Sequence, residues 1–154
     1  MQRRPREAVP GAARTENPSV RNGRWGEEVA TEILRREGYE ILDRNVRPVK
    51  RDQRLEIDII AYDPGRDLLV FVEVKQHKDR SDRGRRLRSV DRRKKRLLKT
   101  ACRSWLATNR WHGSFRFDVV EVYGEPGSGK APETDHIERV QLFAPAERFV
   151  NWAQ

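Results

Sequence analysis

Hydrophobic residues follow two different periods along the chain, and these periods predict its helices and strands. Between residues 21 and 37, apolar side chains recur every three to four positions, which predicts an amphipathic helix that ends at Gly38. Residues 1–20 hold three prolines and few large apolar side chains, so we expect a disordered tail. A second helical stripe is formed by Leu87, Val90, Leu97, Leu98, Ala101, Trp105 and Leu106.

Shorter apolar or alternating segments predict strands, which we place at 39–47, 55–63, 68–77, 115–123 and 138–143. The Pro-Gly turn at 64–67 joins the second and third strands as an antiparallel hairpin. A flexible loop at 125–135 and a closing helix at 145–153 complete the chain. The order α-β-β-β-α-β predicts one α/β domain over 21–154, with a core of about 21–123 and an appendage of about 124–154.

Charged residues interrupt two of these apolar strands. Side chains alternate between the two faces of a strand, so Glu73 and Lys75 share one face, as do Glu56 and Asp58. Pairing through the 64–67 turn brings Asp58 beside Glu73, where two carboxylates repel unless a cation lies between them or one is protonated. Oxygen ligands of this kind suit Mg²⁺ or Mn²⁺. Lys75, about 7 Å beyond Glu73, could orient or deprotonate an attacking water or neutralise charge on a phosphate. The alternative is a surface pair of Glu73 and Lys75, with Asp58 facing solvent.

The composition is that of a polar chain with a modest core. The 154 residues are 36% hydrophobic and 37% charged, which fits a single domain. No apolar run has the 18 or so residues that a membrane helix needs, and the N-terminal segment lacks the apolar stretch of a signal peptide, so a cytoplasmic location is expected. The single cysteine excludes an internal disulfide and a multi-cysteine metal site.

The net charge of +9 is concentrated in one segment. Residues 78–99 hold 12 basic and 3 acidic residues, and the rest of the chain balances at 21 of each. A concentrated positive patch attracts polyanions, of which nucleic acid is the commonest. The alternative is a solvated helix face in an arginine-biased proteome, because 26 of the 33 basic residues are arginine.

Asp58 is followed after fourteen residues by Glu73-Val74-Lys75, and in this order of elements the pattern resembles the restriction-endonuclease-like nuclease superfamily. Within it, the chain is similar to the YraN-like family of predicted endonucleases, which are related to archaeal Holliday-junction resolvases. Leu55 departs from the family pattern, which usually has glycine there. The resemblance covers residues 22 to about 122 and is carried by Gly26-Glu27, Ala30, Gly38-Tyr39, Ile41-Leu42, Arg44-Asn45, Glu56-Ile57-Asp58-Ile59-Ile60-Ala61, Val70-Phe71-Val72-Glu73-Val74-Lys75, Val90, Lys94, Leu97, Ala101 and Arg116-Phe117-Asp118-Val119-Val120.

The resemblance implies roles for particular residues. Asp58 and Glu73 would be metal ligands and catalytic residues, Lys75 the catalytic lysine, and Glu27 a third metal ligand from the first helix. Helical geometry favours Glu27 over Glu28, because Glu27 borders the apolar stripe. An acidic residue that only favours a helix N-terminus is the alternative for Glu27. Glu56 would support the ligands without binding the ion.

The expected function is that of an Mg²⁺- or Mn²⁺-dependent endonuclease. Its expected substrate is DNA rather than RNA, in a branched or otherwise structured form, and no membrane partner is expected. Resolvases act as dimers, so the resemblance also allows a homodimer. A non-catalytic nucleic-acid-binding module and a scaffold that docks an acidic protein remain alternatives. Candidate phosphate contacts are Arg85, Arg86, Arg88, Arg92, Arg93, Lys94 and Lys95.

Overall fold

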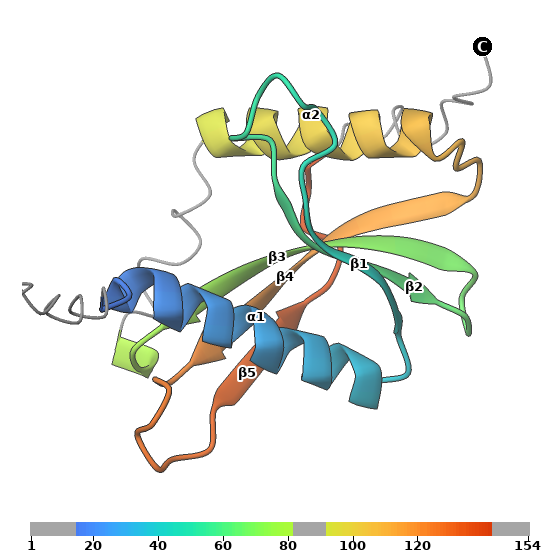
Figure 1. The fold of residues 1–154 in the computed structure, drawn as a ribbon. Helices are drawn as coiled ribbons and strands as arrows, with labels where there is room; N and C mark the ends of the chain where they lie inside the picture. The colour runs from blue at the N-terminus through green and yellow to red at the C-terminus, as the bar shows by residue number, and fades with distance from the viewer. Residues whose placement is uncertain (1–14, 82–91, 143–154) are drawn as a thin grey trace, which may run out of the picture.

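The computed structural model describes residues 15–81 and 92–142, which form a five-stranded sheet with one helix on each face (Figure 1). The sheet order β1-β2-β3-β4-β5 follows the sequence, with β3 and β4 parallel and the other neighbours antiparallel. This is the predicted restriction-endonuclease-like α/β architecture. No helix in the described part of the chain is long and apolar enough to cross a membrane. The elements are α1 (Pro18–Arg36), β1 (Glu40–Val46), β2 (Ile57–Asp63), β3 (Leu68–His77), α2 (Arg92–Thr108), β4 (Ser114–Tyr123) and β5 (Glu133–Ile137).

The alternation along β3 divides the core into two layers. Leu69 and Phe71 pack toward α2, whose buried residues include Leu98 and Leu106. Val70 and Val72 face the other way, in the layer that contains Ala30 and Leu34 of α1. Each helix therefore buries its apolar stripe, which recurs every 3.6 residues, against one face of the sheet. The apolar side chains of each strand alternate between the two faces, so both faces are covered.

The two ladders of β3 have different lengths. The pairing with β4 runs from Leu68↔Ser114 to His77↔Tyr123. The pairing with β2 runs only from Asp63↔Leu68 to Ile59↔Val72. The start of β2 and the second half of β3 therefore separate. Asp58 and Glu73 lie where the strands part, next to each other but beyond the ladder.

The first helix begins earlier than predicted. It starts at Pro18, inside the segment expected to be a disordered tail, rather than at Arg21. Asn17 caps it, because the Asn17 side-chain oxygen accepts a hydrogen bond of 2.9 Å from the Ser19 N–H. Proline is favoured at the first helical position, where its missing N–H costs nothing. The Asn-Pro pair is therefore a helix start.

The last strand was predicted at the wrong place. Residues 133–137 form β5, within and just beyond the expected loop, and residues 138–142 are not in a strand. Residue 143 and the predicted closing helix at 145–153 lie outside the described residues, as do Leu87 and Val90 of the second helical stripe. The sequence of β5, ETDHI, has no apolar alternation, because β5 is an edge strand that is held by polar partners.

These polar partners form a buried network around Asp118 of β4. The Arg116 guanidinium donates to both Asp118 oxygens, at 2.9–3.1 Å, and to the Tyr39 hydroxyl at 2.7 Å. His136 of β5 bridges two carboxylates, with Nε2 2.8 Å from Asp118 Oδ2 and Nδ1 2.8 Å from Glu37 Oε2. The Arg139 N–H donates to Asp118 Oδ1 at 3.0 Å. The network thus ties β5 to β4 and to the end of α1.

Candidate metal centre

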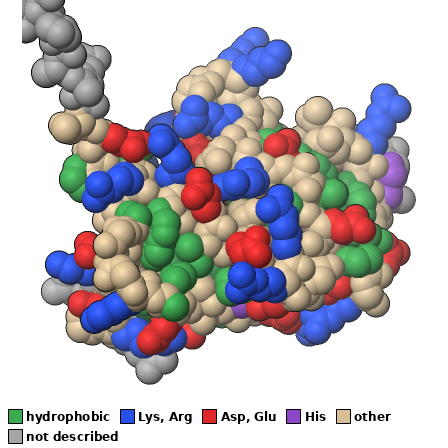
Figure 2. Space-filling model, turned by 60° about the horizontal axis from the view of Figure 1, so that its bottom comes forward, with side chains coloured by type: hydrophobic (Ala, Val, Ile, Leu, Met, Phe, Trp, Pro, Cys, Tyr) green, Lys and Arg blue, Asp and Glu red, His purple; other side chains and the backbone are tan. Residues whose placement is uncertain are grey.

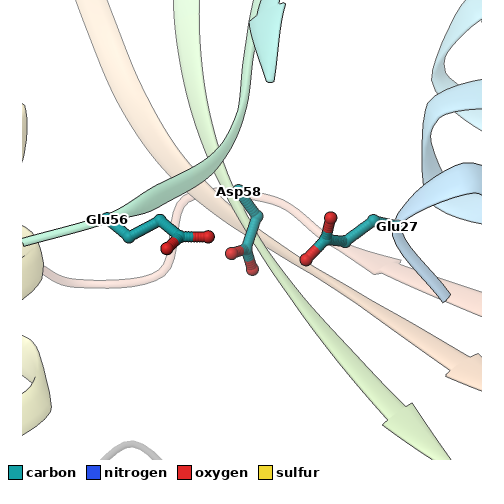
Figure 3. A group of neighbouring side chains, drawn as sticks. All are labelled: Glu27, Glu56 and Asp58. Atoms are coloured by element: carbon teal, nitrogen blue, oxygen red, sulfur yellow. The ribbon is translucent and has the colours of Figure 1, made fainter. Parts of the chain in front are cut away.

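Three carboxylates from two parts of the chain converge where β2 and β3 separate. One ligand oxygen each from Glu27, Glu56 and Asp58 lie within 4.8 Å of one another. Figure 3 shows Asp58 between the other two, with Glu27 reaching in from α1. Glu56 directly precedes β2 and, two residues from Asp58, lies on the same side of the chain, as the strand period predicts.

Asp58 is held by the backbone of the neighbouring strand. Its Oδ2 accepts a hydrogen bond of 2.8 Å from the Val74 N–H, just past the end of the β2–β3 ladder. Burial and, to a smaller extent, the Glu73 carboxylate raise the pKa of Asp58, the bond from Val74 opposes both, and the resulting pKa is about 8. Among the described residues no cation pairs directly with Asp58, so its ionised form is unfavourable until a cation binds beside it.

Glu27 owes its position to a close contact between helix and sheet. A Cβ atom on Gly26 would lie 3.0 Å from Gln76 Cβ, so only glycine lets α1 approach β3 this closely. Burial raises the pKa of Glu27, and a hydrogen bond with the Asn45 side chain opposes the rise. Asn45 has a φ of 50°, a left-handed conformation that asparagine tolerates better than most residues. The sequence analysis assigned Asn45 no role, because neither feature is visible in a local pattern.

The structure groups Glu56, rather than the expected Glu73, with Glu27 and Asp58. Glu56 lies in the carboxylate group, where it also pairs with Arg47 at 2.7 Å. Glu73 lies outside that group, and two amines hold its carboxylate. The distance from Glu73 Oε1 is 3.1 Å to Lys75 Nζ and 2.6 Å to Lys94 Nζ. The Glu73 side chain is 3% exposed, so these ion pairs neutralise a buried charge.

Two cavities border the carboxylates, and Glu56 lines both of them. One, of about 340 Å³, is lined by Glu56, Asp58 and Glu73 and by Lys94 of α2. The other, of about 500 Å³, is lined by Glu27, Glu56 and Asn45, with Arg24 and Arg47 at its sides. All three carboxylates of the group therefore line one or both cavities, where a ligand can reach them.

The donor set fits a small divalent cation. Its ligands are all carboxylate oxygens, which hard ions such as Mg²⁺ prefer. Two oxygens that share one Mg²⁺ lie at most about 4.2 Å apart, since each is about 2.1 Å from the ion. The observed limit of 4.8 Å is close to this value. A cation would also relieve the repulsion that raises the pKa of Asp58. The carboxylate group can therefore hold a metal ion.

The predicted phosphate contacts are only partly described. Arg92, Arg93 and Lys95 are exposed on the first turn of α2, whereas Lys94 turns inward to Glu73. Arg85, Arg86 and Arg88 lie outside the described residues. Figure 2 views the molecule from below Figure 1, and there basic and acidic side chains are intermingled. The basic residues of α2 lie on the opposite helix layer from α1 (Figure 1).

Comparison with known proteins places the chain in a family. The model of "Uncharacterised protein family UPF0102" matches residues 26–122. A UPF0102 protein of Pelobacter propionicus is 43% identical over 126 residues, which cover 77% of this chain and 86% of that protein. One of Thermotoga maritima is 37% identical over 116 residues, covering 75% and 93%. One of Mycobacterium bovis is 36% identical over 124 residues, covering 79% and 92%. The chain therefore belongs to the UPF0102 family, which is the YraN-like family that its motifs resemble.

Proposed function

We propose that this protein is a metal-dependent endonuclease that hydrolyses phosphodiester bonds of DNA. The observation that carries the proposal is the convergence of Glu27, Glu56 and Asp58 near the Glu73–Lys75 pair, with cavities on both sides of Glu56. Glu27 and Asp58, with Glu56, would hold Mg²⁺ or Mn²⁺. When bound, such an ion polarises a phosphoryl oxygen and stabilises negative charge on it.

The reaction adds one water across a phosphodiester bond. The water oxygen forms a bond to phosphorus, and the bond from phosphorus to one sugar oxygen breaks. One proton ends on the leaving sugar oxygen, and the other is released to solvent from the new phosphate monoester. Lys75 Nζ, held 3.1 Å from Glu73 Oε1, presents an ammonium group to the reaction site. There it donates hydrogen bonds to the attacking water or to the phosphate as negative charge grows on it.

The substrate would approach along the basic start of α2. Arg92, Arg93 and Lys95 are exposed near the cavity that Lys94 lines, so they can contact phosphates beside the scissile one. DNA with branches or other structure is the proposed substrate, because the family resembles Holliday-junction resolvases. Phosphate contacts by arginine and lysine set affinity and position, and the shape of the DNA would select the site.

Cleavage assays with a matched pair of variants test the proposal. Purified protein is incubated with labelled duplex, single-stranded, flap and four-way DNA in Mn²⁺ or EDTA. Wild type should cut at least one of these substrates in Mn²⁺ and none in EDTA. Glu27→Gln should lose at least about a hundredfold in rate, equivalent to about 2.7 kcal/mol in the barrier. Glu28→Gln, the same change at the exposed neighbouring residue, should cut like wild type.

Two outcomes would overturn the proposal. Equal cutting by wild type, Glu73→Ala and Lys75→Ala would indicate a contaminating nuclease or a misplaced site. Binding of every DNA without cutting in Mn²⁺ would favour a nucleic-acid-binding module that has the fold without turnover. In that case binding should weaken with salt and survive loss of the carboxylates.

A further inference from the structure

Glu73 is shared by two lysines that come from different elements. Lys75 follows it on β3, and Lys94 comes from the first turn of α2. The Lys94 ammonium is the nearer of the two, at 2.6 Å from Glu73 Oε1 compared with 3.1 Å for Lys75. Lys94 also lines the same cavity as Asp58 and Glu56. It is therefore placed at the reaction site, apart from the exposed basic residues around it.

The two lysines differ in the exposure of their side chains. The Lys75 side chain is 20% exposed and starts from a strand that is paired with β4 at this position. The Lys94 side chain is 45% exposed and starts from a helix at the edge of the cavity. A lysine has a flexible four-carbon stem, so its ammonium can leave one anion for another a few ångströms away without movement of the backbone.

A bound metal ion would change the balance of charge around Lys94. Four carboxylates gather here, and a divalent cation beside Asp58 would bring positive charge close to the Lys94 ammonium. Two cations that lie close together repel each other, and Lys94, the more exposed of the two lysines, can move away. The nearest alternative anion would then be the phosphate of a nucleic acid in the same cavity.

We propose that Lys94 is an active-site residue, which neutralises Glu73 before the metal ion binds and contacts the scissile phosphate afterwards. The inference rests on the proposed nuclease function and adds to it a residue whose position comes from α2. In the metal-free protein Lys94 keeps the buried Glu73 carboxylate paired. During the reaction its ammonium adds a second positive group to the one that Lys75 supplies.

Mn²⁺ titration calorimetry without DNA, followed by cleavage at saturating Mn²⁺, tests this role. Lys94→Met removes a positive charge close to the metal site, so it should bind Mn²⁺ about tenfold more tightly than wild type, yet cut at least about a hundredfold more slowly. Lys130→Met makes the same charge change at an exposed loop position and should leave both values within about twofold. Lys94→Arg keeps the charge and should not tighten Mn²⁺ binding. Should Lys94→Met fail to fold, Lys94→Gln provides the same two measurements.

These outcomes distinguish a failure of the role proposed for Lys94 from a failure of the proposed nuclease function. If wild type binds Mn²⁺ and cuts DNA but Lys94→Met matches it in both assays, the role of Lys94 is wrong and the nuclease stands. Slower cutting with unchanged Mn²⁺ affinity would overturn the exchange of Lys94 between Glu73 and phosphate. If wild type neither binds Mn²⁺ nor cuts, the proposed function itself fails.

Discussion

Asp58 at the start of β2 and Asp118 in the middle of β4 have opposite electrostatic surroundings. Asp118 is 0% exposed, whereas Asp58 is only partly buried. Burial alone would raise the pKa of Asp118, but hydrogen bonds from His136 and Arg116 outweigh it and lower the pKa below the ordinary value. Burial and the neighbouring Glu73 instead raise the pKa of Asp58 to about 8. The more deeply buried aspartate is thus the more acidic one.

The difference shows that partners, rather than depth, decide what a buried carboxylate does. Asp118 has a guanidinium, an imidazole and a backbone N–H in direct contact, so its charge is matched within the protein. Asp58 has one backbone N–H and lies among other carboxylates. A matched carboxylate holds the fold together, whereas an unmatched one is available to a cation from outside.

The largest expected effect is on activity, from one substitution made at both aspartates. Asp58→Asn removes a ligand charge and should slow DNA cleavage at least about a thousandfold, or about 4 kcal/mol in the barrier. The cleavage rate of Asp118→Asn should stay within about fivefold of the wild-type rate, measured at a temperature where this variant is folded. Steady-state cleavage in Mn²⁺ gives both values. A variant Asp58→Asn with more than a tenth of wild-type activity would break the comparison.

The same two variants should show the opposite order in stability, because Asp118→Asn should be the more destabilising of the two. Asp118→Asn leaves the Arg116 guanidinium buried without its counter-ion, so the free energy of unfolding should fall by about 3 kcal/mol. Asp58→Asn removes repulsion among the carboxylates, so the free energy of unfolding should fall by less than about 1 kcal/mol or should rise. Urea unfolding followed by tryptophan fluorescence measures both, without metal ions. Equal losses in the two variants would show that Asp58 is as much a structural residue as Asp118.

A smaller effect should appear in the pH dependence of stability. Burial alone would lower the pKa of His136, but hydrogen bonds to Asp118 and Glu37 outweigh it and raise the pKa above the ordinary value. A group with a raised pKa stabilises the fold fully below its unfolded-state pKa, about 6.5 for histidine. That stability is lost as the pH rises through the folded-state pKa.

The contribution of His136 to wild-type stability should therefore fall by about 1 kcal/mol, the size of one hydrogen bond, as the pH rises from 6.5 through the folded-state pKa of His136. His136→Gln should lack this contribution, whereas the fall caused by the raised pKa of Asp58 should occur in both proteins. Urea unfolding at a series of pH values, on both proteins, provides the measurement. Parallel curves for wild type and His136→Gln would contradict the assignment.

The smallest effect concerns the contact that positions Glu27. In Gly26→Ala the helix gains up to about 1 kcal/mol of propensity, while the new methyl group meets Gln76 Cβ at 3.0 Å. These contributions oppose each other, so stability should change by less than about 1 kcal/mol. The helix must shift by a few tenths of an ångström, which should weaken Mn²⁺ binding a few-fold in calorimetry.

Gly23→Ala provides the matched control on the same helix. A Cβ atom at Gly23 meets nothing within 4 Å, so this variant should gain stability and leave Mn²⁺ affinity unchanged. Equal Mn²⁺ affinities for the two variants would show that the close approach of α1 to β3 does not set the position of Glu27.

Local sequence patterns predicted those helices and strands whose positions depend only on their own residues. The β2–β3 hairpin follows from apolar alternation and the Pro-Gly turn, and it places Asp58 beside Glu73 as expected. β5 could not be predicted in this way, because its place depends on Asp118 and Glu37, which are distant in sequence. The grouping of Glu56, rather than Glu73, with Glu27 and Asp58 could not be predicted for a similar reason. Strand period puts both carboxylates at the site, but only the fold brings Lys94 to Glu73.

The order of the site residues along the sequence has a consequence for the nascent chain. All three clustered carboxylates precede the turn at 64–67, whereas Lys75 and Lys94 follow it. A chain that is still being synthesised, or one cut short after β2, thus holds the acids without the amines. If the protein is the proposed nuclease, it becomes able to cut only when synthesis has passed α2 and that helix has packed against the sheet, so a partly made copy poses no hazard to the nucleic acids around it.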